Sequence, residues 1–295
     1  MTLVWSPNYL GSPGKLILAK EYRAFNPSDI ETALWLDAAD ASTITESGGA
    51  VSQWDDKSGN GRNAAQANAG NRPTYQLAAI NSRNVVRFSA ASSQTLGCAG
   101  TAGAFNFLHA SQGLILVVGS VATTANPDTL YGIAGNSGGF IPSRRGFTIF
   151  WDDRSSIGAS NRLGVAGYDG TNTNVFSESL ADVLLPQSPA LFGAAVDATN
   201  ATLAQRSTLL VNGSTYQSNT ASATASAGNA SFDWQIGDYR TGFAFLQGDI
   251  AEMVIVPGSV STLNRQKLEG YLAHKWGLTA NLPADHPYKT VEPTP

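Results

Sequence analysis

Two adjacent stretches, Gly248-Asp-Ile-Ala-Glu-Met-Val-Ile-Val256 and Ser261-Thr-Leu-Asn-Arg-Gln-Lys-Leu-Glu-Gly-Tyr-Leu-Ala-His-Lys-Trp276, differ in the period of their apolar residues. The first is rich in β-branched and apolar residues, which predicts a well-buried strand. Pro257-Gly258 ends that strand, because this dipeptide favours a turn. In the second stretch the apolar residues recur three or four positions apart, and Gly277 follows where a glycine commonly ends a helix. The sequence therefore predicts a buried strand followed by one C-terminal helix.

Short candidate strands separated by turn residues fill most of the chain before this helix. They are Ala33–Leu36, Val85–Phe88, Leu114–Val121, Phe147–Trp151, Gly164–Tyr168, Leu191–Val196, Ser207–Val211, Trp234–Gly237 and Ile250–Val256. Asn212-Gly213 between two apolar runs predicts a hairpin with a type I′ turn, which requires positive φ at both central residues. Two small and polar stretches, Ala64–Gly70 and Asn219–Asn229, predict exposed loops. This pattern is typical of an antiparallel β sandwich.

Composition narrows the classes of partner. Charged residues make up 14% of the 295 residues, and the net charge of -4 comes with no basic run. Nucleic acid is therefore not an expected partner. No apolar run reaches 18 residues, so we expect no transmembrane helix. We also recognise no standard secretory signal. Cys98 is the only cysteine, which excludes an intrachain disulfide and predicts a small buried apolar side chain.

Three segments carry a resemblance to a known family. Ala33-Leu-Trp-Leu-Asp-Ala-Ala-Asp40, the loop Asp56-Lys-Ser-Gly-Asn-Gly61, and the closing segment from Gly248 to Tyr288 are similar to the concanavalin A-like lectin/glucanase superfamily in its laminin G-like form. The resemblance implies an all-β fold, a two-sheet antiparallel jelly-roll sandwich with one C-terminal helix. We expect the jelly-roll domain at residues 30–288, an extended N-terminal docking arm at 1–29 and a tail at 289–295.

The glycine-rich acidic loop is the candidate metal site. Calcium prefers carboxylate, amide and carbonyl oxygens, and laminin G-like relatives can hold calcium in the corresponding region. Asp56 and Asn60 match that region by position, and Asp249 and Glu252 could approach from the closing strand. The alternative is that the loop's Asp and Asn side chains cap a tight turn. We expect that the protein requires no cofactor. The ion that this loop could hold is a structural calcium ion.

Sugar contact and hydrolysis are separate hypotheses. Trp54 and Trp151 stand beside acidic turns, so we expect them to be exposed and able to stack on a sugar, with core packing as the alternative. The acidic strand motif of the related glucanases is absent. Glycoside hydrolysis needs two carboxyls flanking the bond, and the nearest clusters are Asp152-Asp153 and the pair Asp249 and Glu252. Residues three apart face opposite sides of a regular strand, so we predict that the chain is not an enzyme.

The resemblance also suggests where such a protein works, because similar domains are frequent in tailed-bacteriophage virion proteins and bacterial surface proteins. We expect a non-enzymatic virion structural protein, made in the host cytoplasm and displayed on the virion surface as a capsid- or tail-attached decoration or adhesion module. It would contact other virion proteins through the arm, bind host glycans and form a homo-oligomer. The expected docking residues are Trp5, Tyr9, Tyr22 and Phe25. The alternatives are a free carbohydrate-binding lectin-like protein and a glycoside hydrolase with a non-standard site.

Overall fold

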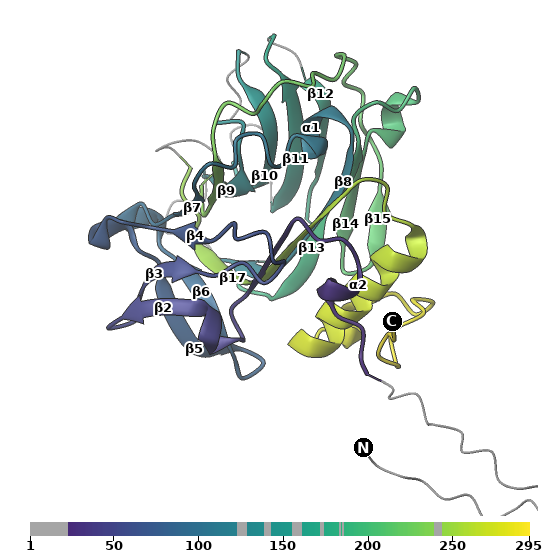
Figure 1. The fold of residues 1–295 in the computed structure, drawn as a ribbon. Coiled ribbons are helices and arrows are strands. Elements are labelled where there is room, and N and C mark those ends of the chain that lie inside the picture. The colour runs from purple at the N-terminus through teal and green to yellow at the C-terminus, as the bar shows by residue number, and fades with distance from the viewer. Residues whose placement is uncertain are drawn as a thin grey trace, which may run out of the picture.

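The computed structural model describes residues 23–122, 129–138, 143–154, 161–171, 174–182, 184, 186–238 and 244–295. In this part of the chain seventeen strands pair antiparallel, and the 15-residue α2 is the only α-helix longer than four residues (Figure 1). The elements are β1 (Leu34–Asp37), β2 (Ile44–Ser47), β3 (Ala50–Trp54), β4 (Ala64–Ala65), β5 (Thr74–Ile80), β6 (Arg83–Phe88), β7 (Leu96–Cys98), α1 (Phe107–Ala110), β8 (Gln112–Val121), β9 (Leu130–Gly135), β10 (Arg145–Asp152), β11 (Arg162–Asp169), β12 (Asn174–Leu180), β13 (Ala190–Asp197), β14 (Ser207–Val211), β15 (Ser214–Tyr216), β16 (Trp234–Ile236), β17 (Gly248–Pro257) and α2 (Thr262–Trp276). The all-β prediction is confirmed.

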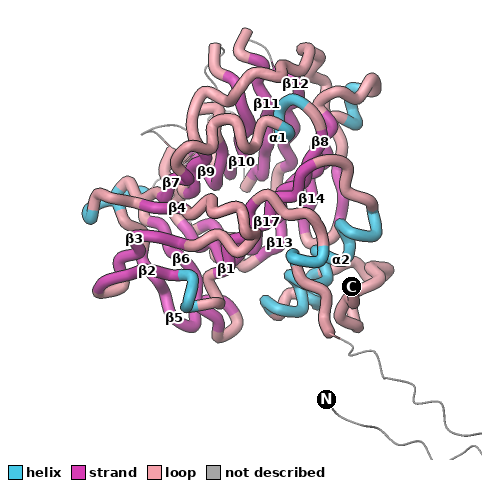
Figure 2. Tube along the Cα trace, viewed as in Figure 1, coloured by secondary structure: helices cyan, strands magenta, loops and turns pink. Residues whose placement is uncertain are grey.

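The strands form two layers (Figure 2). The helix-side sheet has the order β15-β14-β13-β8-β17, and the free edge of β17 pairs first with β6 and then with β1. The far sheet has the order β2-β3-β4-β7-β16-β9-β10-β11-β12. A single residue pair, Ala50 with Thr74, joins β3 of the far sheet to β5 beside β6. β17 thus occupies the middle of its sheet, as its run of apolar residues predicts.

Two apolar cores lie on opposite faces of the helix-side sheet. Ile115 and Val117 of β8 belong to the inner core, which lies between the two sheets. Leu114, Leu116 and Val118 belong to the outer core, which lies between the helix-side sheet and α2. Successive side chains of a strand point to opposite faces, so a strand buried on both faces reads as a continuous apolar run. This explains why β8 and β17 show no polar alternation.

The C-terminal helix has the boundaries that its sequence predicts. The Ser261 side chain accepts a hydrogen bond from Asn264 N at 3.2 Å, which satisfies one free amide of the first turn. Gly277 has φ of 67°, and the Leu278 amide donates to Ala273 O at 2.8 Å, the pairing of a Schellman motif. Leu268, Leu272, Ala273 and Trp276 of α2 bury their side chains in the outer core. Among the described residues no helix is long and apolar enough to cross a membrane.

The predicted β14–β15 hairpin also forms. Asn212 and Gly213 have φ of 49° and 81°, as a type I′ turn requires. A Cβ on Gly213 would lie 3.0 Å from Pro283 Cδ and 3.1 Å from ring and side-chain atoms of His286 and Leu282. The turn therefore needs glycine both for its backbone and for close packing of the C-terminal tail.

Residues at the two ends of the described chain meet. Phe25 is 2% exposed in the outer core, and its amide donates to Pro293 O at 2.8 Å. The expectation that Phe25 docks onto another virion protein is wrong, because the chain buries this side chain against itself. The other three expected docking residues, Trp5, Tyr9 and Tyr22, lie outside the described residues.

All nine predicted strands form, whereas the predicted loop Ala64–Gly70 is partly wrong. Its first residue, Ala64, is completely buried and belongs to β4. Cys98 is also completely buried, as predicted, and burial raises the pKa of its thiol to about 12. Both residues lie in the inner core. A small side chain can therefore lie in a polar-looking segment and still face the interior.

Candidate functional site

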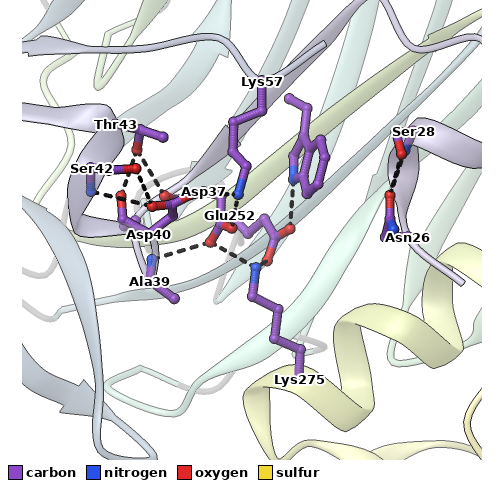
Figure 3. A network of polar contacts seen from close by, with 12 residues as sticks. Asn26, Ser28, Asp37, Ala39, Asp40, Ser42, Thr43, Lys57, Glu252 and Lys275 are labelled. Atoms are coloured by element: carbon purple, nitrogen blue, oxygen red, sulfur yellow. Dashed lines mark hydrogen bonds and ion pairs between the residues drawn. The ribbon is translucent and has the colours of Figure 1, made fainter. Parts of the chain in front are cut away.

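Glu252 lies at the centre of a polar network beneath α2 (Figure 3). Its side chain is completely buried. The indole nitrogens of Trp35 and Trp276 each donate to this carboxylate at 2.7 Å, and the Tyr271 hydroxyl donates at 3.0 Å. The Lys275 ammonium lies 2.6 Å from the second oxygen. One carboxylate thus binds β1, β17 and α2 together.

The network continues to the surface through a chain of alternating charges. Lys275 Nζ also lies 2.7 Å from Asp37 Oδ1, and Lys57 Nζ lies 2.9 Å from Asp37 Oδ2. Lys57 further contacts Asp40 at 2.7 Å and lies over the ring of Trp35. Figure 3 shows the two lysines reaching Asp37 from opposite directions, and of the two only Lys275 also pairs with Glu252. Every charged group in this cluster has an oppositely charged neighbour, as burial requires.

The environment changes the ionisation of this cluster. Burial raises the pKa of Glu252, and burial together with the charge of Glu252 raises the pKa of Tyr271. At the outer end, the Lys57 ammonium and the Ser42 hydroxyl lower the pKa of Asp40 to about 2. A side chain with no exposed surface cannot meet a ligand, so the Glu252 network anchors the helix to the sheet.

The Asp56–Gly61 loop forms a capped turn. The Asp56 carboxylate accepts hydrogen bonds from the amides of Trp35, Ser58 and Arg62 at 2.9 to 3.0 Å. Asn60 Nδ2 donates to Thr32 O at 2.9 Å. These contacts belong to the alternative interpretation, in which Asp and Asn side chains satisfy a tight turn.

The four predicted calcium ligands do not share one site. Asp249 is held by Arg87, and Glu252 is held by tryptophan and lysine donors, whereas Asp56 and Asn60 serve the turn. Within the described ranges, no group of three or more His, Cys, Asp or Glu residues is placed to hold a metal ion. The described residues thus do not gather these four side chains around one ion, and a structural calcium ion stays a prediction.

The prediction that Trp54 and Trp151 are exposed is wrong. Both side chains are completely buried in the inner core, and neither indole nitrogen has a hydrogen-bond partner among the described residues. Neither residue can stack on a sugar from this position. Trp151 follows Phe147 and Ile149 at a spacing of two, which places all three on one face of β10 and is the signal that the acidic neighbours obscured.

The prediction that Asp249 and Glu252 face opposite sides of β17 is also wrong. The pairing of β17 with β8 shifts between Ile250 and Glu252, which marks a β-bulge at Ala251. Ile250 and Met253 both face the inner core although they are three residues apart. The extra residue therefore places Asp249 and Glu252 on the same outer face. They still have separate partners and form no carboxyl pair.

The other acidic cluster considered for hydrolysis is likewise engaged. Arg154 donates from Nε and from one terminal nitrogen to the two oxygens of Asp152, each at 2.8 Å. Asp152 is 3% exposed, so its carboxylate is covered as well as paired. This bidentate pair holds the end of β10.

A polar pocket opens on the outer face, at the end of β17 that α2 does not cover. Its volume is about 350 Å³, and it is lined by Ala79, Ile80, Arg87, Ser120, Ala122, Gln187, Pro189, Gln247, Gly248 and Asp249. Arg87 donates from Nε and a terminal nitrogen to the two oxygens of Asp249, at 2.6 and 2.9 Å. This ion pair raises the pKa of Arg87. We call this site the Arg87–Asp249 pocket.

The backbone of β17 and β8 forms the floor of this pocket. A Cβ at Gly248 would lie 2.2 Å from Ser120 O, so only glycine allows the two strands this approach. Gln247 is fixed because its side-chain oxygen accepts from Ala90 N at 3.0 Å and its carbonyl accepts from Ala122 N at 2.8 Å. Sequence analysis missed this site, although Val85-Val86-Arg87-Phe88 alternates in a way that sends Arg87 away from the inner core.

Comparisons with known proteins identify a fold and no family. No family model matches the chain, and no curated protein matches it. The botulinum neurotoxin serotype D binding domain is similar over 81% of this chain and 50% of that chain, with 12% identity and a TM-score of 0.50. The CBM40 module of the Ruminococcus gnavus IT-sialidase is similar over 60% of this chain and 90% of that chain, with 12% identity and a TM-score of 0.42. NanB sialidase from Streptococcus pneumoniae is similar over 61% of this chain and 26% of that chain, with 15% identity and a TM-score of 0.43.

At these identities the similarity concerns the fold alone. The chain has an antiparallel β sandwich, and it spans half the length of the botulinum neurotoxin domain that it matches. The fold class is thereby defined, and the function has to be argued from the residues of the site.

Proposed function

We propose that this chain is a non-enzymatic carbohydrate-binding module whose ligand site is the Arg87–Asp249 pocket. The observation that carries the proposal is the polar lining of an open cavity of about 350 Å³ on the uncovered part of the outer face. Sugars are recognised by a few fixed polar groups in a pre-formed concave site. Here Arg87, Gln247 and Ser120 supply such groups from three neighbouring strands or strand ends.

The similar structures support the same function class. The R. gnavus module was solved with sialyllactose bound, and it belongs to a sialidase. A glycan-binding role for a β sandwich of this kind agrees with the lectin-like alternative that the sequence raised. It also agrees with the absence of the glucanase motif from the sequence.

A glycan array probed with the intact chain tests the proposal. We expect binding to at least one glycan class, and we expect Arg87→Ala to abolish it. Arg154→Ala is the matched control, because Arg154 forms a bidentate pair with Asp152 of similar exposure away from the pocket. An array with no signal, or equal loss in both variants, would contradict the proposed site.

The setting in which the module works is a further part of this proposal. We propose display on the surface of a tailed-phage virion, and the basis is the sequence resemblance alone. Immuno-electron microscopy of purified particles provides the test, with label on capsid or tail as the expected result. If label stayed off the particles while glycan binding persisted, the free lectin-like protein would replace the virion module.

Catalysis is tested on the same ligands. Each glycan that binds is incubated with the chain and assayed for release of reducing ends. We expect none, because the two carboxylates on β17 are separately bound by cations and by indole donors. Turnover that Asp249→Asn removes would instead identify a hydrolase with a non-standard site.

A further inference from the structure

We propose that the Arg87–Asp249 pocket selects neutral, hydroxyl-rich glycans over glycans that carry a carboxylate. This inference rests on the proposed function and specifies its ligand class. It comes from the charges and the hydrogen-bonding groups that line the cavity.

The charges on the described lining of the pocket cancel. Arg87 and Asp249 are the only charged residues among the ten that line it, and they neutralise each other through a bidentate contact. The Asp249 side chain is 8% exposed, whereas that of Arg87 is 45% exposed. A ligand therefore contacts the Arg87 guanidinium, whose positive charge the less exposed Asp249 carboxylate already neutralises.

The pocket also offers a ligand both hydrogen-bond donors and hydrogen-bond acceptors. A guanidinium has five N–H groups, and two of those on Arg87 point to Asp249. The side-chain oxygen of Gln247 accepts a hydrogen bond from Ala90 N, so its side-chain N–H groups point away from Ala90. The Ser120 hydroxyl can both donate and accept. Neutral sugar hydroxyls also donate and accept, so they can match donors and acceptors together.

A ligand carboxylate would be a second anion beside Asp249, and its binding would cost free energy. A ligand carboxylate that reached Arg87 would approach the nearly buried Asp249 as well. Two carboxylates that share one cation in a partly desolvated site repel each other, and one of them must be protonated or hydrated. Among the described residues that line the pocket, Arg87 is the one cation and Asp249 already pairs with it, so a ligand carboxylate meets no unpaired cation there.

The test uses an array in which each neutral oligosaccharide is paired with its sialylated counterpart, followed by calorimetry on the best pairs. For the natural chain we expect the neutral member to bind at least about tenfold more tightly. Asp249→Asn keeps the shape of the side chain and frees the charge of Arg87. We expect this variant to gain binding to sialylated members, with an affinity that falls as salt is added.

Asp152→Asn is the matched control, since it removes the carboxylate of the similar Arg154 pair outside the pocket. It should leave the neutral preference unchanged. Circular dichroism confirms that each variant is folded, and if Asp249→Asn does not fold, the natural chain's preference between paired glycans decides the question alone. A preference of the natural chain for sialylated members would overturn this inference and leave the glycan-binding function standing. Absence of binding to every glycan would overturn the function itself.

Discussion

β17 carries two carboxylates on the same outer face, Asp249 at the end that α2 leaves uncovered and Glu252 where α2 covers the strand, and their surroundings differ. Glu252 lies where α2 covers the sheet, and two indoles, a phenol and an ammonium surround it completely. Asp249 lies beyond the helix, with a single half-exposed arginine as its ionic partner. The residue type is nearly the same, so its neighbours decide its role. A covered carboxylate joins elements of the fold, whereas an uncovered one is left beside a cavity.

The largest expected effect comes from removing the charge at the covered end. Glu252→Gln puts an amide N–H group where Trp276 and Lys275 need an acceptor, and it leaves Lys275 undercompensated. Breaking one partner of a buried ionic cluster costs about 3–5 kcal/mol. Urea denaturation should show that decrease in unfolding free energy. Glu31→Gln on the exposed surface is the control and should change little, and equal values for the two variants would contradict the anchoring role.

The indole donors provide a smaller and sharper comparison. Trp276 and Trp234 are both completely buried, but only Trp276 donates its N–H to a partner, whereas that of Trp234 has none in the structure. Trp276→Phe deprives the buried Glu252 carboxylate of one donor, whereas Trp234→Phe removes an N–H group that has no acceptor in the structure. We expect Trp276→Phe to lose about 1–3 kcal/mol more unfolding free energy. Similar losses in the two variants would show that the bond to Glu252 contributes nothing net.

At the uncovered end the effect on stability should be modest. Arg87→Gln removes the ion pair of Asp249, but the arginine side chain is 45% exposed and water can reach the site. Exposed ion pairs contribute about 1 kcal/mol or less, so unfolding free energy should fall by about that amount. A loss as large as that of Glu252→Gln would mean that the pocket pair is part of the core.

The smallest effect belongs to Asp40, at the solvent end of the Glu252 network. Lys57 and Ser42 lower its pKa from 3.8 to about 2, so the folded chain binds fewer protons here than the unfolded chain between these values. Its contribution is therefore complete above pH 3.8 and is lost as the pH falls through about 2. Because Asp40 is 35% exposed, Asp40→Asn should cost less than about 1 kcal/mol at pH 7.

Urea denaturation of the natural chain and Asp40→Asn at pH 7 and at pH 2 checks this expectation. The difference in unfolding free energy should shrink at the lower pH. A difference that stays constant across this range would show that Asp40 acts through its turn hydrogen bonds and not through its charge.

The sequence predicted what depends on local patterns. The α2 boundaries follow from Ser261 and Gly277, and the type I′ hairpin follows from Asn212-Gly213, because caps and turns are decided by a few adjacent residues. Polar edge strands such as Ile44–Ser47, whose residues are half-buried or exposed, carry no such pattern and were missed.

The site depended on contacts that no local pattern encodes. The bond from Trp35 to Glu252 joins residues 217 positions apart, and the Arg87–Asp249 pair joins residues 162 apart. The acidic neighbours of Trp151 suggested exposure, although its spacing from Phe147 and Ile149 indicated the core. Short-range polarity competed with strand periodicity, and periodicity was the better guide to burial.

The bulge at Ala251 lets one strand behave as two segments with independent phases. Before it, Gly248–Ile250 pairs with β6 and borders the pocket, and after it, Glu252–Ile255 pairs with β1 and supports the helix. Deleting Ala251 would leave a regularly alternating strand in which Ile250 still faces the inner core and Glu252 still faces outward. With the bulge in place, Asp249 and Glu252 stand three residues apart instead of two, and each has its own set of partners. Ala251 thus adds one residue between the carboxylate beside the pocket and the carboxylate beneath the helix, while both stay on the outer face.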